Sequence, residues 1–172
     1  LNENGLVGYE YNPLLLYIKD VLDFENADIR VMFFGQDMSD GDWYNYNRYS
    51  DVLTECMPAY KTFDNKIGSI DTNGHRMTKG MGGGMNLFIK YFNSKFQGKN
   101  VRYVWDDIVK IGRNTRSNQY RDILKEIEKS EFDVLREEIK IIQPQILIFF
   151  TGPDFYWEDI LQKRIGITAN EY

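Results

Sequence analysis

The sequence has few of the residues that build disulfides, cysteine metal centres or histidine-based catalytic sites. Its 172 residues include one cysteine, Cys56, and one histidine, His75. A single cysteine excludes a disulfide within the chain and a cysteine-cluster metal site, and it is typical of a reducing compartment. Neither residue has a partner at a readable spacing, so a serine or cysteine catalytic triad has little support. We therefore expect a cytoplasmic protein.

Long hydrophobic runs are also absent. The longest apolar stretches are strand-sized, such as residues 146–150, whereas a bilayer-spanning helix needs about 20 apolar residues. Hydrophobic residues make up 42% of the chain, which is enough for a core and too much for a disordered chain. We expect residues 1–172 to form a single soluble domain with no membrane partner.

The chain has no excess of positive charge. Its 21 basic and 26 acidic residues give a formal net charge of −5 at pH 7. This balance argues against a protein that coats a polyanion by charge alone. Local basic faces remain compatible with it.

Hydrophobic periodicity predicts helices alternating with strands. Strands are expected over residues 29–34, 101–105 and 145–150, and a first helix is expected from Asn12-Pro13, where asparagine caps and proline fits the first helical turn. A long irregular segment over residues 36–84 interrupts the pattern and is typical of a lid or binding loop. The apolar faces of the expected helices are Leu14, Ile18, Val21 and Leu22; Met85, Phe88, Ile89 and Phe92; Tyr120, Ile123, Leu124 and Ile127; Phe132, Leu135, Ile139 and Ile142; and Trp157, Ile160 and Leu161.

Helix-breaking and helix-capping residues indicate where the expected helices begin and end. Gly98 and Pro144 each end a helix, and Ser130 with Asp133 resembles a capping box that predicts a fresh helix start at Ser130. The resulting order predicts an α/β fold, a three-layer α/β/α sandwich with a mostly parallel central sheet.

The carboxyl ends of parallel strands are where such folds bind ligands. Here these ends are expected at Gly35-Gln36-Asp37, at Asp106-Asp107 and at Thr151-Gly152-Pro153-Asp154. We expect the three ends to run side by side and to open onto one shared hollow.

The acids at these ends suggest water or base chemistry. Asp37 could orient or deprotonate a water, or it could simply cap the turn after its strand. Asp106-Asp107 could hydrogen-bond a base edge, share a proton or hold a divalent cation such as magnesium. Adjacent strand residues point to opposite faces, so only one of these two acids can face the site.

A glycine-rich run, residues 79–84, leads into the helix that is expected to begin right after it. Free amides there attract anions, so the run is either a phosphate nest or a flexible turn. It lacks the lysine-hydroxyl ending of a Walker loop, which disfavours nucleotide hydrolysis.

Aromatic residues gather early in the long irregular segment, at Trp43, Tyr44, Tyr46 and Tyr49, with asparagines and Arg48 between them. Such a stretch could stack on a nucleobase and hydrogen-bond its edges. It could equally fold over the core.

With these residues in view, the chain resembles the uracil-DNA glycosylase superfamily. A hydrophobic strand ends in Gly35-Gln36-Asp37, similar to the start of that family's water-activating motif. A middle strand ends at Trp105-Asp106-Asp107-Ile108, where the family has its base-reading asparagine, and residues 144–152 resemble the family's later hydrophobic strand ending in glycine.

This resemblance implies a DNA base-excision N-glycosylase, a hydrolase that grips an extruded base and needs no metal or cofactor. Asp37 would position the water, Asp106 would occupy the base-reading position, and Gln36 would offer its backbone amide to the base. The remaining residues assigned to substrate binding are Gly35, Trp43, Tyr44, Asp107 and Gly152. DNA or a nucleobase-containing ligand is then the expected partner.

The chain also departs from the family pattern. Met38-Ser39-Asp40 stands where a proline-tyrosine-histidine continuation is expected, and residues 1–172 contain no histidine-proline-serine segment. Aspartate at position 106 replaces asparagine and exchanges a donor for an acceptor unless it is protonated. A non-catalytic module that binds a nucleotide, an anion or a protein therefore stays open as the alternative.

Overall fold

The computed structural model describes residues 10–13, 16–18, 20–37, 80–113, 123, 126–130, 133–151 and 162–166. Its elements are β1 (Glu10–Pro13), α1 (Val21–Glu25), β2 (Ile29–Asp37), α3 (Gly80–Lys95), β3 (Val101–Val109), β4 (Ile111–Arg113), α5 (Leu135–Ile142) and β5 (Ile146–Phe149). Residues 126–130 are also helical. Within these ranges, no helix has the length and apolar character needed to cross a membrane.

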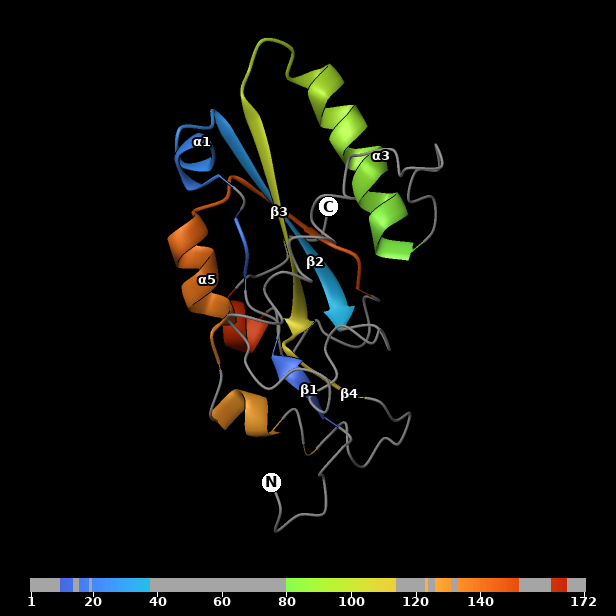
Figure 1. Cartoon of the computed structure of the whole chain (residues 1–172), viewed down its shortest axis with the longest axis vertical. Helices are drawn as coiled ribbons and strands as arrows, with labels where there is room; N and C mark the ends of the chain where they lie inside the picture. The colour runs from blue at the N-terminus through green and yellow to red at the C-terminus, as the bar shows by residue number, and fades with distance from the viewer. Residues whose placement is uncertain are drawn as a thin grey trace.

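A parallel sheet of three strands forms the centre of the fold, in the order β3-β2-β5 (Figure 1). Ile29 pairs with Val101 at one end of β2, and Asp37 pairs with Val109 at the other. Parallel neighbours need crossover connections, which α3 and the α5 segment supply. The predicted α/β fold with parallel strands is confirmed. β1 and β4 form a separate antiparallel pair that the sequence pattern does not indicate.

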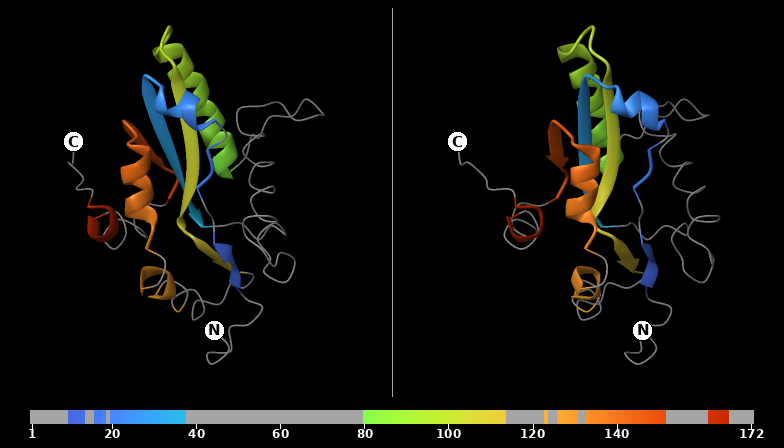
Figure 2. Two further views of the ribbon diagram at one scale, coloured as in Figure 1. Left: turned by 60° about the vertical axis from the view of Figure 1, so that its left-hand side comes forward. Right: turned by 90° about the vertical axis from the view of Figure 1, so that its left-hand side faces the viewer.

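Each face of this sheet carries its own hydrophobic cluster. Side chains alternate along a strand, so Val31 and Phe33 of β2 face α3, whereas Met32 and Phe34 face α5 and α1. Figure 2 shows α3 on one side of the sheet and α5 on the other. The α3-side cluster also contains Met85, Phe92 and Val101, and the α5-side cluster also contains Phe24, Val104, Ile108, Leu135 and Ile142.

The glycine-rich run belongs to helix α3 rather than to a loop before it. The helix begins at Gly80, so the prediction that it starts after the glycines was wrong. Gly82 and Gly83 are buried, and a Cβ added at Gly84 would lie 2.5 Å from a ring carbon of Phe150. The missing side chain at Gly84 therefore lets α3 approach Phe150 closely, a structural use of glycine that neither a phosphate nest nor a flexible turn provides.

The helix predicted from Asn12-Pro13 was also wrong. Glu10–Pro13 is strand β1, and proline is tolerated there because a two-stranded pair consists of edge strands. The helix begins only at Val21, where the carboxylate of Asp20 accepts a hydrogen bond of 3.0 Å from the amide of Asp23. Aspartate at this position satisfies one of the free amides of the first turn.

Two helices do occupy the region before β5, as predicted, but their boundary differs. Ser130 lies within the helical segment rather than before a helix start, and its hydroxyl donates to the carbonyl of Ile127 at 3.2 Å. Helix α5 starts at Leu135, so the capping box at Ser130 was wrong. The predicted helix ends at Gly98 and Pro144 were confirmed. Helix α3 is followed by Gly98 at φ 79°, and α5 ends before Pro144. The expected helix with Trp157, Ile160 and Leu161 lies outside the described residues.

Candidate functional site at the carboxyl edge of the sheet

The carboxyl ends of β2, β3 and β5 lie at one edge of the sheet, with β2 in the middle. Asp37 of β2 pairs with Val109 of β3, and the amide of Phe150 donates to the carbonyl of Phe34 at 2.8 Å. The prediction that these strands run side by side in one direction is confirmed. Gly84, near the N-terminus of α3, contacts Phe150, so this helix end lies at the same edge.

The structure brings several of the predicted site residues to this edge. Asp37 is the last residue of β2, Gln36 is exposed, and Gly35 is buried and pairs with Asp107. Trp43, Tyr44 and Gly152 lie outside the described residues, as does the side chain of Asp37.

Asp106 and Asp107 lie inside β3 and not after its end. The expectation that the strand closes at these acids was wrong, because Ile108 and Val109 continue both the strand and its apolar contacts. Asp106 pairs with Phe34 on the α5 face, and Asp107 pairs with Gly35, so alternation turns Asp107 toward the α3 face. The two acids therefore belong to different surroundings.

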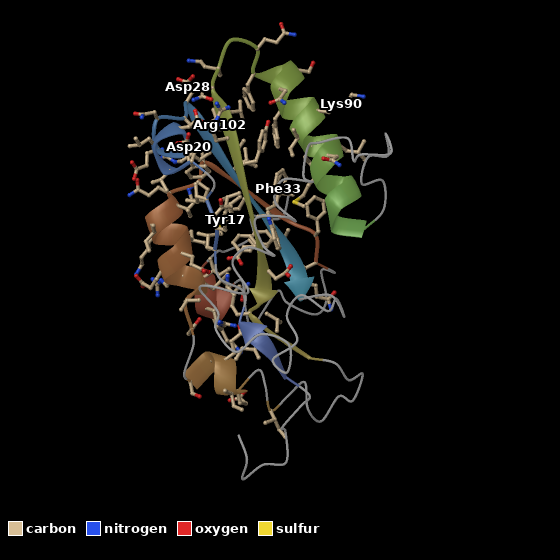
Figure 3. The ribbon with its side chains drawn as sticks, in the orientation of Figure 1. Tyr17, Asp20, Asp28, Phe33, Lys90 and Arg102 are labelled. Atoms are coloured by element: carbon tan, nitrogen blue, oxygen red, sulfur yellow. The ribbon has the colours of Figure 1, made fainter. Side chains whose placement is uncertain are left out.

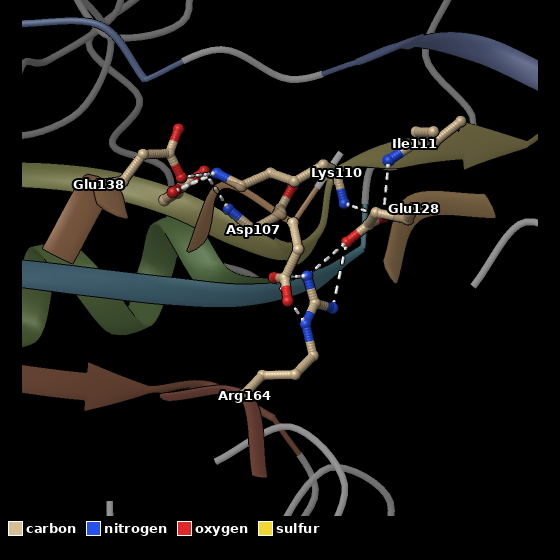
Figure 4. Close-up of polar contacts among 8 residues, drawn as sticks. Asp107, Lys110, Ile111, Glu128, Glu138 and Arg164 are labelled. Atoms are coloured by element: carbon tan, nitrogen blue, oxygen red, sulfur yellow. Dashed lines mark hydrogen bonds and ion pairs between the residues drawn. The ribbon is translucent and has the colours of Figure 1, made fainter. Parts of the chain in front are cut away.

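Asp106 is fully buried and belongs to an ionic cluster, of which Figure 4 labels Lys110 and Glu138. Its carboxylate pairs with the ammonium of Lys110, whose Nζ also lies 2.6 Å from Oε2 of Glu138 on α5. The other carboxylate oxygen, Oδ1, accepts a hydrogen bond of 2.8 Å from the amide of Asp107. Burial raises the pKa of Asp106 well above its ordinary value; Lys110 opposes this rise and Glu138 adds to it.

A second buried acid, Glu128, fixes the turn between β3 and β4. Its Oε2 accepts hydrogen bonds from the amides of Lys110 at 2.7 Å and Ile111 at 3.1 Å, and its Oε1 accepts from Arg164 at 3.3 Å. Arg164 also lies 2.6 Å from Asp133. Burial raises the pKa of Glu128, while the two amides and Arg164 act in the opposite direction.

These ionic partners were missed by the reasoning from sequence. The sequence contained one signal for the Lys110 pair. At two-residue spacing along an extended chain, an acid, an apolar residue and a base share one side: Asp106, Ile108 and Lys110. Glu128 and Arg164 carry no such local signal, because they meet only in the folded chain.

The described residues contain no group of three side chains arranged to hold a metal ion, so they lend the magnesium alternative no support. The ammonium of Lys110 occupies the place beside Asp106 that a cation would need. In comparisons with protein-family models, curated proteins and solved structures, nothing matches this chain.

Proposed function

We propose that this chain is a DNA base-excision N-glycosylase of the uracil-DNA glycosylase type, with a three-layer α/β/α fold and Asp37 as the acid that orients water. One observation carries the proposal. The strand that ends in Gly35-Gln36-Asp37 is the middle strand of a parallel sheet, and the β3 and β5 ends flank it. Residues from all three ends can thus contribute to a single site, as ligand-binding parallel folds require.

The register of β2 against β3 supports a change in the base-reading residue. Asp106 is fully buried and paired with Lys110. Asp107 pairs with Gly35, two residues before Asp37. Both acids are buried, but Asp107 lies on the opposite face of the sheet from the pair of Asp106 and Lys110. We therefore assign contact with the base to Asp107 and leave Asp106 as a structural residue.

The proposed reaction is hydrolysis of the bond between a base and its sugar. Asp37 would accept a hydrogen bond from a water and direct its oxygen to the anomeric carbon, while the base leaves with the bonding electron pair and later takes up a proton. An ionised Asp107 can only accept hydrogen bonds, so the base must present an N–H group to it. Uracil, thymine and hypoxanthine each carry a ring N–H of this kind.

The test is release of base from DNA duplexes that contain uracil, a thymine mismatch or hypoxanthine. We expect release from at least one of them and a loss of roughly 100-fold or more with Asp37→Asn, since positioned acids and bases contribute about that much. Glu126→Gln, which neutralises an exposed acid of the 126–130 helix, is the matched control and should cleave normally. Absence of cleavage and of base-dependent binding in all three duplexes would refute the enzymatic proposal.

A non-catalytic binding module is the second candidate, and one observation favours it. The position where the glycosylase pattern reads the base, Asp106, is occupied by an internal ion pair. In this case Asp37→Asn would weaken binding of a nucleotide or base-containing strand while no turnover is detected with either protein. A measurable hydrolysis that disappears in Asp37→Asn would reject the binding module.

A further inference from the structure

Three ionisable side chains lie together between β3 and α5, and we call them the buried triad: Asp106, Lys110 and Glu138. Figure 4 labels Lys110 and Glu138. Nζ of Lys110 contacts the Asp106 carboxylate and lies 2.6 Å from Oε2 of Glu138. The side chains of Asp106 and Lys110 are fully buried, and that of Glu138 is 12% exposed. One ammonium therefore serves two carboxyl groups in a place from which water is nearly excluded.

The charges of the buried triad do not balance if all three groups are ionised. Two carboxylates and one ammonium would leave one net negative charge buried, which is strongly unfavourable. Arg164, the nearby cation of the adjacent acidic cluster, is already engaged by Glu128 and Asp133. Across the sheet, Asp106 faces β2 at Phe34, which is apolar and buried.

One oxygen of the buried triad is short of a hydrogen bond. Oε2 of Glu138 is buried and, within the described part of the chain, accepts no hydrogen bond, although it is close to the ammonium of Lys110. Both carboxyl groups contact the same Nζ, so the two acids meet at one ammonium. A proton on one of them would become a donor whose acceptor is the other carboxylate.

We propose that Asp106 and Glu138 share one proton at neutral pH, and that this proton latches α5 onto β3. The proton is taken from solvent when the chain folds and returns to solvent when the pH rises. The shared state is electrically neutral and satisfies the orphaned oxygen of Glu138. Titration then belongs to the pair rather than to either residue alone.

The electrostatics agree in direction with this latch. Burial raises the pKa of Asp106 well above its ordinary value, against the effect of Lys110 and with that of Glu138. A group with a raised pKa in the folded state stabilises the fold fully at acid pH, and this contribution is lost as the pH rises through the folded-state pKa. One proton per molecule corresponds to an unfolding constant that rises up to about tenfold per pH unit in that window.

The latch is independent of the proposed enzymatic activity. It concerns the contact between β3 and α5, and it would make the end of the strand that carries Asp107 sensitive to pH. Its test therefore needs no substrate.

The test is chemical unfolding of the full chain across pH, with Glu138→Gln compared with Glu137→Gln. Glu137 is the adjacent, exposed acid of α5, where it pairs with Lys140, so the control makes the same chemical change on the same helix. The wild type and Glu137→Gln should lose stability as the pH rises through the folded-state pKa of the carboxyl pair. Their unfolding constants should rise by up to about tenfold per pH unit. Glu138→Gln keeps a balanced Lys110–Asp106 pair and should lose that slope. An unchanged slope in Glu138→Gln would overturn the latch.

A second measurement covers the case in which a variant fails to fold. Carbon NMR of the side-chain carboxyl groups in the wild type should show one of the Asp106 and Glu138 groups protonated at neutral pH, or an averaged signal that reports one shared proton. Signals from two fully ionised groups at neutral pH would refute the proposal.

Discussion

Gly84 of α3 lies against the ring of Phe150 so closely that a Cβ at position 84 would be 2.5 Å from the ring carbon Cε1. The ring cannot retreat freely, because Phe150 stacks on Phe33 and meets Phe88 edge to face. Contact between the helix and the carboxyl edge of the sheet thus depends on the absence of a side chain at position 84.

Gly84→Ala is therefore expected to lower the free energy of unfolding. Forcing a methyl group into this contact costs about 1–3 kcal/mol, while the better helix propensity of alanine returns about 1 kcal/mol. Chemical denaturation measures the difference. Adding Phe150→Leu should recover part of the loss caused by Gly84→Ala, and purely additive effects in the double variant would contradict the contact.

Glu128 should matter more for its acceptor atoms than for its shape. Glu128→Ala leaves the buried amide of Lys110 and the partly buried amide of Ile111 without their acceptor, while Arg164 keeps Asp133, and the change should cost about 3 kcal/mol. Glu128→Gln keeps one carbonyl oxygen for the amides of Lys110 and Ile111, so it should cost less. Equal losses of unfolding free energy for the two variants would contradict this assignment.

Asp23 and Arg102 form an ion pair at the opposite end of the sheet, where Figure 3 labels Arg102 near Asp20 and Asp28. The hydrogen bond from Arg102 holds the pKa of Asp23 below its ordinary value. The contribution of this pair is present above the ordinary pKa and is lost as the pH falls through the folded-state value. Asp23→Asn should slightly reduce the loss of unfolding free energy that occurs as the pH falls. Added salt should weaken this effect, because the ion pair is half exposed. A larger loss at acid pH would contradict it; Glu25→Gln, an exposed neighbour in α1, is the control.

Tyr103 should dominate the loss of unfolding free energy at alkaline pH. Burial raises its pKa from 10.0 to about 12, with Arg102 opposing the rise, and its hydroxyl donates to Oδ1 of Asn93 at 2.7 Å. As the pH rises through this range, the stabilising contribution of the protonated hydroxyl is lost. Tyr103→Phe should remove that loss and cost about 1 kcal/mol at neutral pH. An unchanged loss at alkaline pH in Tyr103→Phe would place the titration on another tyrosine.

The positions of the central strands could be predicted from the sequence. The apolar run 31–34 is buried between the two hydrophobic clusters, and residues 146–149 are partly buried against both clusters, so composition alone indicates these strands. The ends of these strands were harder to predict, because β2 and β3 each continue into polar residues. Asp106 stays in the strand because Lys110 and Glu138 compensate it, and no local pattern shows that Glu138 will be there.

The secondary structure of some short segments depends on contacts with residues far away in the sequence. Glu10–Pro13 reads as a helix start, yet it pairs with Ile111–Arg113, which is about a hundred residues away. The glycines of α3 indicate a loop by propensity, yet they lie in a helix, and at Gly84 the close approach of Phe150 favours glycine. In both cases tertiary contact outweighed a weak local preference.

The claim that ligand binding occurs at the carboxyl edge is tested most directly by amide NMR during titration with a single-stranded, uracil-containing oligonucleotide. We expect the shifted amides to cluster at Gly35, Gln36, Asp37, Asp107 and Phe150, with weaker changes after Asp37→Asn. Shifts confined to the opposite edge, at Ile29 and Val101, or no shifts at all, would contradict the account.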